Sequence, residues 1–148
     1  MFKPKEILVP TDFSHPSDKA LGEAIDIAKQ YRARIHLLHV IPRDLDYMCS
    51  VDYCVDAGTV QQLEEQALSG ATQSLQKQLQ KFADARAVQV VTEVRKGHPA
   101  EEILKAQEEK GIDLMVMAPL GRTGIEKFLL GSVTNNVVKR ARCLVLLV

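Results

Sequence analysis

The residues best suited to chemistry lie in a glycine-rich stretch that runs from Met117 to Thr134 and contains Gly131-Ser132. Glycines let the main chain approach an anion closely. A helix beginning at Gly131-Ser132 would direct unpaired N–H groups and the positive end of its dipole towards a phosphate. The same residues could form a turn followed by a helix cap, because serine caps helices whether or not a ligand is present. The stretch therefore indicates either a phosphate site or a structural turn.

A second group of candidates follows the first apolar run of the chain. Thr11 and Asp12 come directly after residues 6–10, and their hydroxyl and carboxylate could meet a ligand. They could equally end a strand, with Ser14 capping a helix whose first turn contains Pro16. Residue types alone leave both interpretations open.

The histidines and cysteines do not predict a metal centre. His36 and His39 are three positions apart on an expected strand, so they point to opposite faces and cannot bind one ion. His98 precedes a proline at a helix entry, where a capping or surface role is expected. Cys49 and Cys54 could form a zinc or redox site, but without a second pair of ligands we favour free thiols. The 3 cysteines of the chain form no paired framework, which fits a reducing compartment.

The composition is that of one soluble globular domain covering residues 1–148. A chain of 148 residues with 46% hydrophobic and 26% charged residues can bury one core without disulfides or metal. Its 19 basic residues are balanced by 19 acidic ones, so no overall field attracts nucleic acid or an anionic membrane. No apolar segment approaches the roughly 18 residues of a membrane span, and none at the start is typical of a secretion signal. We therefore expect a cytoplasmic protein with no nucleic-acid or membrane partner.

Strand and helix patterns alternate along the chain. Short apolar or β-branched runs predict five strands, and apolar residues recur with helical spacing between them. Such alternation, with right-handed crossovers, predicts an α/β fold with a doubly wound parallel sheet. Its ligand site should lie at the carboxyl ends of the strands, where the strand order reverses. The expected strands are 6–10, 35–40, 88–94, 114–117 and 143–148, and the expected helices include 20–31, 63–82, 100–104 and 133–141.

Two connections, 41–59 and 119–131, are long for a compact domain. Loops of this length usually carry function. The first could close over the site as a lid or remain in solvent.

The last expected strand, 143–148, is almost entirely apolar. An open apolar edge favours pairing with another chain. A second copy of this chain or a helix of the same chain could cover it, and we favour the second copy.

Four segments of the chain occur together, in this order, in one known family. They are Ile7-Leu8-Val9-Pro10-Thr11-Asp12-Phe13-Ser14, Leu37-Leu38-His39-Val40, Gly97-His98-Pro99-Ala100-Glu101-Glu102-Ile103, and the glycine-rich stretch with the last strand. In these segments the sequence resembles the universal stress protein family, from Lys5 to Val148. The resemblance implies a Rossmann-like, five-stranded parallel sheet with strand order 3-2-1-4-5 and a homodimer through Cys143 to Val148. It also implies an adenine nucleotide as ligand: ATP, with or without Mg²⁺, or AMP or ADP.

The resemblance further implies a set of nucleotide-binding residues. Residues 10–12 would line the ribose and adenine side, and Val40 and Met117 would lie against the base. The glycine-rich stretch would hold the phosphates through main-chain groups and hydroxyls, and Arg122, otherwise a solvated surface residue, would screen their charge. The implied set is Pro10, Thr11, Asp12, Val40, Met117, Ala118, Gly121, Arg122, Gly131, Ser132, Val133 and Thr134.

The sequence departs from the family pattern at two positions. Nucleotide-binding members carry a glycine, two residues, a second glycine, nine residues and then Gly-Ser or Gly-Thr. Here Gly121 and Gly131-Ser132 match, but Ala118 occupies the first position, and Leu120 stands where the family often has a histidine. If position 118 needs a positive φ or a close approach of phosphate, its methyl group would cost about 1 kcal/mol and weaken binding several-fold.

Three functions fit these observations. The first is an ATP-binding regulatory or stress-response protein that acts as a dimer on an unidentified regulatory protein partner. The second is a dimeric interaction module of the same family that has lost its nucleotide, which Ala118 and Leu120 favour. The third is a slow ATPase or phosphotransferase using Arg122 and Ser132. The usual signatures of three large enzyme classes are missing, so we assign no catalytic residue and expect at most weak ATP hydrolysis.

Overall fold

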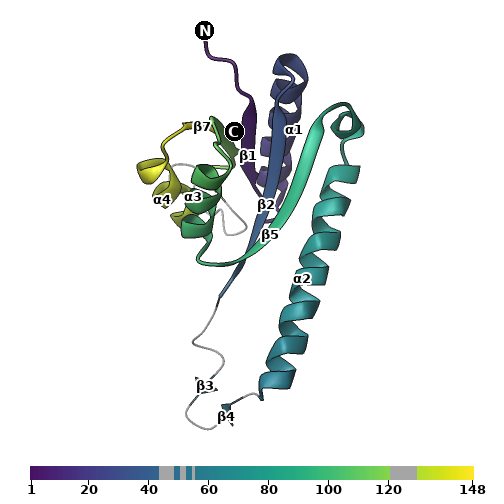
Figure 1. Cartoon of the computed structure of the whole chain (residues 1–148), viewed down its shortest axis with the longest axis vertical. Coiled ribbons are helices and arrows are strands. Elements are labelled where there is room, and N and C mark those ends of the chain that lie inside the picture. The colour runs from purple at the N-terminus through teal and green to yellow at the C-terminus, as the bar shows by residue number, and fades with distance from the viewer. Residues whose placement is uncertain (44–48, 51–52, 55, 121–129) are drawn as a thin grey trace.

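Five parallel strands form the central sheet in the order β5-β2-β1-β6-β7. The neighbouring strands β5, β2 and β1 can be followed in Figure 1. The computed structural model describes residues 1–43, 49–50, 53–54, 56–120 and 130–148. Counted along the chain, the strands of the sheet follow the order 3-2-1-4-5, which confirms the predicted α/β topology. The strands are β1 (Glu6–Pro10), β2 (Arg34–Pro42), β5 (Gln89–Gly97), β6 (Leu114–Met117) and β7 (Leu144–Leu147).

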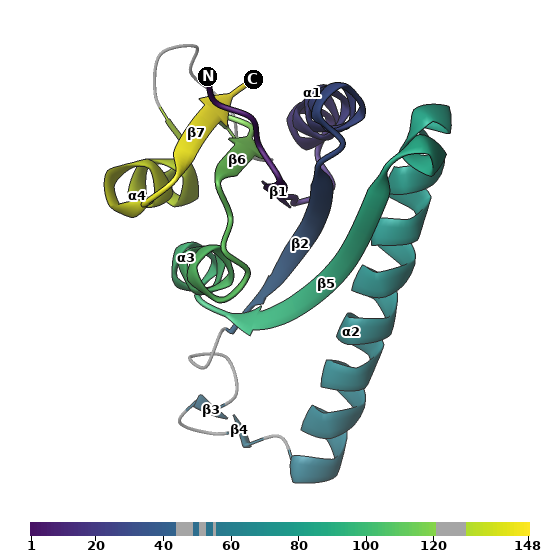
Figure 2. The ribbon, with the colours of Figure 1, turned by 45° about the horizontal axis from the view of Figure 1, so that its top comes forward.

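Four α-helices cover the two faces of the sheet (Figure 2). Residues of α1 and α2 pack with Ile7, Val9 and Ile35 on one face, whereas residues of α3 and α4 pack with Leu8 and Met115 on the other. Both faces of the sheet are therefore buried at its three central strands, as a parallel sheet requires, while the two edge strands are more exposed. The helices are α1 (His15–Tyr31), α2 (Ala57–Gln80), α3 (Pro99–Glu109) and α4 (Ser132–Arg140), with a 3₁₀ helix at Ala83–Ala87.

Strand pairing is unequal across the sheet. β2 and β5 pair over nine positions, from Arg34 opposite Gln89 to Pro42 opposite Gly97. β1 and β6 pair at only two positions, Ile7 with Leu114 and Leu8 with Met115. The central strands therefore separate soon after they pair, and this opens the sheet at its carboxyl edge.

Helix α2 begins earlier than the sequence predicts. Asp56 caps it by accepting from the Thr59 N–H at 3.0 Å, and the helix starts at Ala57 rather than at residue 63. Residues 57–70, the first half of α2, are almost all exposed. The apolar pattern that predicts the helix begins only at Leu63, because residues 57–62 contain one large apolar side chain, Val60. Figure 1 shows this half of α2 continuing past the sheet towards β4. No helix in the described ranges, α2 included, is long and apolar enough to cross a membrane.

The predicted loop 41–59 also contains more regular structure than expected. β2 continues to Pro42, and two short strands, β3 (Cys49–Ser50) and β4 (Tyr53–Cys54), pair antiparallel outside the main sheet. Residues 44–48, 51–52 and 55 lie outside the described residues. Whether this connection closes over the site as a lid therefore stays a prediction.

Candidate functional site

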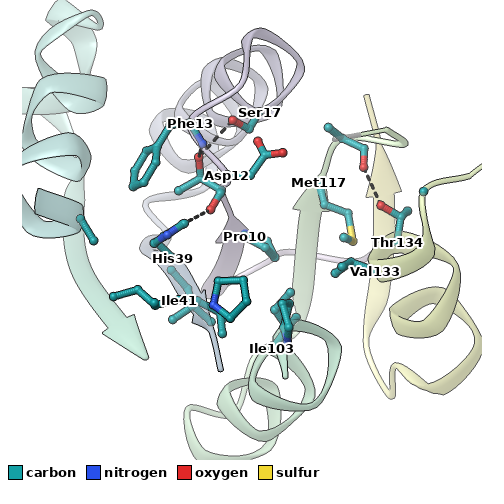
Figure 3. A pocket seen from close by; sticks show the side chains of 18 of the residues that line it. Pro10, Asp12, Phe13, Ser17, His39, Ile41, Ile103, Met117, Val133 and Thr134 are labelled. Carbon is teal, nitrogen blue, oxygen red and sulfur yellow. Dashed lines mark hydrogen bonds between the residues drawn. The ribbon is translucent and has the colours of Figure 1, made fainter. Parts of the chain in front are cut away.

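A cavity of about 670 Å³ opens at the carboxyl ends of β1, β2 and β6, bordered by α2, α3 and α4 (Figure 3). It lies where the strand order reverses, since β1 pairs with β2 on one side and β6 on the other. Gly121 and Arg122 lie outside the described residues. All other predicted site residues line the cavity: Pro10, Thr11, Asp12, Val40, Met117, Ala118, Gly131, Ser132, Val133 and Thr134.

The cavity also has a wall that the sequence analysis missed. Ala67, Gly70, Ala71 and Ser74 line it from α2. Their spacing places these small side chains on one face of the helix. A Cβ atom added at Gly70 would meet nothing within 4 Å, so the space beside it is open. The spacing is visible in the sequence, but small residues on a helix face usually indicate packing rather than a site.

The turn between β1 and α1 presents Asp12 to the cavity in a fixed conformation. Figure 3 shows Asp12 at the end of β1 across the cavity from Met117. The Ser14 N–H donates to Asp12 Oδ1 at 3.0 Å, and Phe13 adopts a left-handed φ of 65°. A non-glycine residue in this region costs roughly 1 kcal/mol, and such strain often marks a functional turn. Ser14 caps α1 by accepting from the Ser17 N–H at 3.3 Å, so the capping interpretation is confirmed alongside the place of Asp12 in the cavity.

The Thr11 hydroxyl is already engaged within the protein. It lies 2.9 Å from Gln78 Oε1 and 3.0 Å from Ser17 Oγ, and the Thr11 residue is only 7% exposed. The same oxygen accepts the Phe13 N–H at 3.1 Å. Thr11 therefore shapes the cavity wall, while its side-chain polar atom faces protein partners.

The two histidines of β2 have different surroundings, as predicted. His36 Nε2 lies 2.7 Å from Glu6 Oε2, whereas His39 Nδ1 lies 2.8 Å from the Thr11 carbonyl oxygen. Because a carbonyl oxygen only accepts, His39 Nδ1 carries the proton of this bond. The His39 ring also packs on Phe13 with centroids 4.4 Å apart. The described residues contain no cluster of metal-ligating side chains.

The edge of β2 beside the cavity exposes main-chain hydrogen-bonding groups. The Thr11 N–H donates to the Leu38 carbonyl at 2.8 Å, which is the last main-chain bond between β1 and β2 in the described chain. Main-chain groups two residues apart on a strand point the same way, so the N–H and C=O of Val40 point to this edge too. The next acceptor for Val40 would be the Thr11 carbonyl, but in the described chain this oxygen accepts from His39 and makes no main-chain bond with Val40. Val40 therefore directs a donor and an acceptor side by side towards the cavity that it lines.

The opposite wall is the N-terminus of α4. Gly131 is its N-cap and Ser132 its first residue, so the prediction that the serine caps the helix is wrong, although the turn before the helix is present. The N–H groups of residues 132–134 have no acceptor within the helix, since the first such bond joins the Asn135 N–H to the Gly131 carbonyl at 2.8 Å. These amides and the helix dipole favour an anion.

Two hydrogen bonds tie the start of α4 to the end of β6. The Gly131 N–H donates to the Pro119 carbonyl at 2.8 Å, and the Thr134 hydroxyl donates to the Ala118 carbonyl at 2.9 Å. Thr134 thus uses its hydroxyl proton within the protein and offers a ligand its main-chain N–H. The residues on either side of the undescribed segment 121–129 are held together independently of that segment.

Ala118 fits its position without backbone strain. Among the described non-glycine residues only Phe13 and Arg32 have a positive φ, so Ala118 does not. The strain that a methyl group would bring at a left-handed position is therefore absent.

The described lining carries one formal charge, that of Asp12. Two basic residues, one at the end of α4 and one just beyond it, lie outside the cavity and pair with α3: Arg140 with Glu101, and Arg142 with Glu108 at 3.2 Å. The hydrogen bond from Arg140 holds the pKa of the Glu101 carboxyl below its usual value. The anion-binding capacity of the described cavity thus comes from main-chain amides, and its carboxylate suits a hydroxyl donor.

Comparison with known proteins identifies one family. A family model described as "Universal stress protein family" matches residues 3–148. Universal stress protein MJ0531 of Methanocaldococcus jannaschii is 37% identical over 144 residues, covering 97% of this chain and 81% of its own. The structure of universal stress protein UspA from Lactobacillus plantarum superposes with a TM-score of 0.80 at 26% identity, covering 100% of this chain and 99% of that one.

Two more distant structures share the fold and contain nucleotides. A universal stress protein in complex with cAMP gives a TM-score of 0.71 at 21% identity over 99% of this chain and 98% of its own. The universal stress protein from Archaeoglobus fulgidus in complex with dAMP gives 0.55 at 16% identity over 99% of this chain and 97% of its own. From the matched residues, the fold and these relatives, the chain belongs to the universal stress protein family.

Proposed function

We propose that this protein binds an adenine nucleotide, ATP in the first instance, and acts as a cytoplasmic, dimeric regulatory protein of the stress response. One observation carries the proposal: the edge of β2 at Val40 and the N-terminus of α4 face the same cavity. The first offers paired hydrogen-bonding groups to a base, and the second offers unpaired amides to a phosphate.

The groups at Val40 match the edge of adenine. Adenine has an exocyclic amino group that donates and an adjacent ring nitrogen, N1, that accepts. The carbonyl and N–H of Val40 can pair with these two groups, and the apolar side chains of Met117 and Ile103 line the same cavity beside it. The base would thus be recognised chiefly by main-chain atoms.

Asp12 and α4 fit the remainder of a nucleotide. A carboxylate repels phosphate but accepts from the hydroxyls of ribose, so Asp12 suits the sugar. The amides of residues 132–134 suit the phosphates, and Arg122 and Gly121 remain candidates from the sequence. The cAMP and dAMP complexes of distant relatives support the use of this fold for adenine nucleotides, although they concern those proteins.

Calorimetry tests the proposal directly. The protein should first be unfolded, stripped of any nucleotide carried through purification and refolded, and then titrated with ATP and Mg²⁺. We expect saturable binding and an increase in thermal stability, since a ligand that binds only the folded state stabilises it. No heat and no thermal shift at millimolar ATP would reject the proposal.

Ala118 favours one rival, a family member that has lost its nucleotide. We expect Ala118→Gly to change the dissociation constant for ATP by less than about threefold, because the alanine is unstrained and only a methyl contact changes. Calorimetry of parent and variant in parallel measures this. Binding by the glycine variant where the parent shows none would support the rival instead.

The last strand favours a homodimer. β7 is an edge of the sheet, and Leu144 and Leu146 are 56% and 38% exposed on it. No helix in the described part of the chain covers these side chains. A second copy that pairs along β7 would bury these side chains and pair the free main-chain N–H and C=O groups of the edge strand.

Leu146→Lys should convert the dimer into a monomer, because it places a charge within the proposed contact. Sedimentation velocity measures the change. Leu63→Lys is the matched control, since Leu63 on α2 is 57% exposed and lies outside the strand. A Leu146→Lys variant that sediments like the parent dimer would place the contact elsewhere.

A further inference from the structure

We propose that Gln78 is a positioning residue of this site: from α2, its buried amide fixes the turn that presents Asp12. The inference rests on the proposed function for its effect on nucleotide affinity. Gln78 belongs to no motif, lies 67 positions from Thr11 in the sequence and is 2% exposed.

A buried glutamine amide requires partners for both its oxygen and its nitrogen. Gln78 Oε1 lies 2.9 Å from Thr11 Oγ1, and Gln78 Nε2 lies 2.8 Å from Asp18 Oδ1. Asp18, on α1, also pairs with Lys81 at 2.7 Å. The glutamine thus links the β1–α1 turn, helix α1 and helix α2.

The neighbouring groups allow only one orientation of this amide. The Asp18 carboxylate accepts only, so it must face the Nε2 group, and Oε1 then faces Thr11. Because Oε1 also only accepts, Thr11 must give it its hydroxyl proton. The Ser17 hydroxyl is not a source of that proton, since it donates to the Ser14 carbonyl at 2.7 Å. Its oxygen is a second acceptor 3.0 Å from Thr11 Oγ1, but it also accepts from Gln78 Nε2 at 3.4 Å, whereas Oε1 has no other donor among the described residues.

The direction of the Thr11 hydroxyl determines the next residue of the turn. With its proton given to Gln78, the Thr11 oxygen presents lone pairs to the Phe13 N–H, which donates to it at 3.1 Å. This bond holds Phe13 in its left-handed conformation, with φ 65°, directly after Asp12. Gln78 therefore preorganises the turn before a ligand arrives, and preorganisation raises affinity by lowering the ordering cost of binding.

The test replaces Gln78 with methionine, which has a similar shape and no amide. In nucleotide-free protein, we expect amide hydrogen exchange at Phe13, resolved by NMR, to accelerate about tenfold as its acceptor loses its fixed direction. We also expect the dissociation constant for ATP to rise about tenfold, which corresponds to one net hydrogen bond of preorganisation.

Gln107→Met is the matched control. Gln107 is 5% exposed on α3, and its Oε1 accepts the Arg142 N–H at 3.1 Å, away from the cavity. This variant also loses a buried amide bond, but we expect neither exchange at Phe13 nor ATP affinity to change. If Gln78→Met does not fold, Thr11→Val removes the same bond from its other end and should give the same two effects.

The two measurements separate this inference from the proposed function. A parent protein that does not bind ATP would reject the function, while faster exchange at Phe13 would still support the positioning of the turn by Gln78. Unchanged amide exchange at Phe13 in Gln78→Met would overturn the inference, whether or not the affinity for ATP changes. Faster exchange with unaltered ATP affinity would overturn its link to the site.

Discussion

Replacing Ser132 with proline should lower the affinity for ATP roughly 10- to 100-fold while leaving the fold intact. The substitution removes an amide donor from the phosphate site, together with the serine hydroxyl. Loss of one hydrogen bond to a charged group, about 1.5 to 3 kcal/mol, accounts for a loss of this size, and the hydroxyl is expected to add little. Titration calorimetry measures the change in affinity, and circular dichroism monitors the fold.

The fold should tolerate this proline because Ser132 is the first residue of α4, where its N–H has no acceptor within the helix. Gly131 before it has a ψ of 156°, which suits a residue that precedes proline. Helix α3 already carries Pro99 at the same position.

Two controls make the result specific. Ser132→Ala removes only the hydroxyl and should weaken binding less than the proline does. Ala57→Pro introduces proline at the first position of α2, after Asp56 with a ψ of 154°, and should leave ATP binding unaltered. Full ATP affinity in Ser132→Pro would show that the phosphates lie elsewhere.

The second large effect is a preference for adenine over guanine. We expect ATP to bind at least about 100-fold more tightly than GTP, because guanine presents a carbonyl and a ring N–H where adenine presents an amino group and a bare nitrogen. With GTP, the N–H of Val40 would face a ring N–H and its carbonyl would face a carbonyl. Competition calorimetry with the two nucleotides measures the ratio.

Purine riboside triphosphate is the matched ligand for this test. It lacks the amino group but keeps the accepting nitrogen, so it should bind with an affinity between those of ATP and GTP. Equal affinities for ATP and GTP would show that the Val40 edge does not recognise the base.

The fold class could be predicted because the local patterns that determine it are present in a single sequence. Short apolar runs mark the strands of a sheet covered on both faces, and their alternation with helices gives the parallel topology. The strand order itself came from the family resemblance, because periodicity contains no information about which strands are neighbours. The start of α2 was missed because residues 57–62 lack the apolar periodicity from which the rest of the helix was predicted.

Only some of the candidate site residues could be predicted from the sequence. Gly131 and Ser132 could be proposed from residue type and spacing, and Asp12 as one of two interpretations, since strand ends and helix starts have recognisable signatures. Val133 and Thr134 were named through the family resemblance. Gln78 could not, because its role depends on a hydroxyl 67 positions away and on a carboxylate on another helix. Val40 could be named only through the family resemblance, because what it offers comes from its main chain, which any residue carries.

The scarcity of pairing between β1 and β6 has a mechanical consequence. The strands β5, β2 and β1 form one part of the sheet, and β6 and β7 form the other. The two parts are joined within the sheet by two paired positions. A nucleotide that reaches from Val40 and Asp12 to the start of α4 would contact both sides of this line and connect them. Without it, the two parts would be connected across this line by those two pairs and by the side chains of α1, which pack on both β1 and β6. A bound nucleotide should therefore stiffen the sheet across this line more than it changes the average shape.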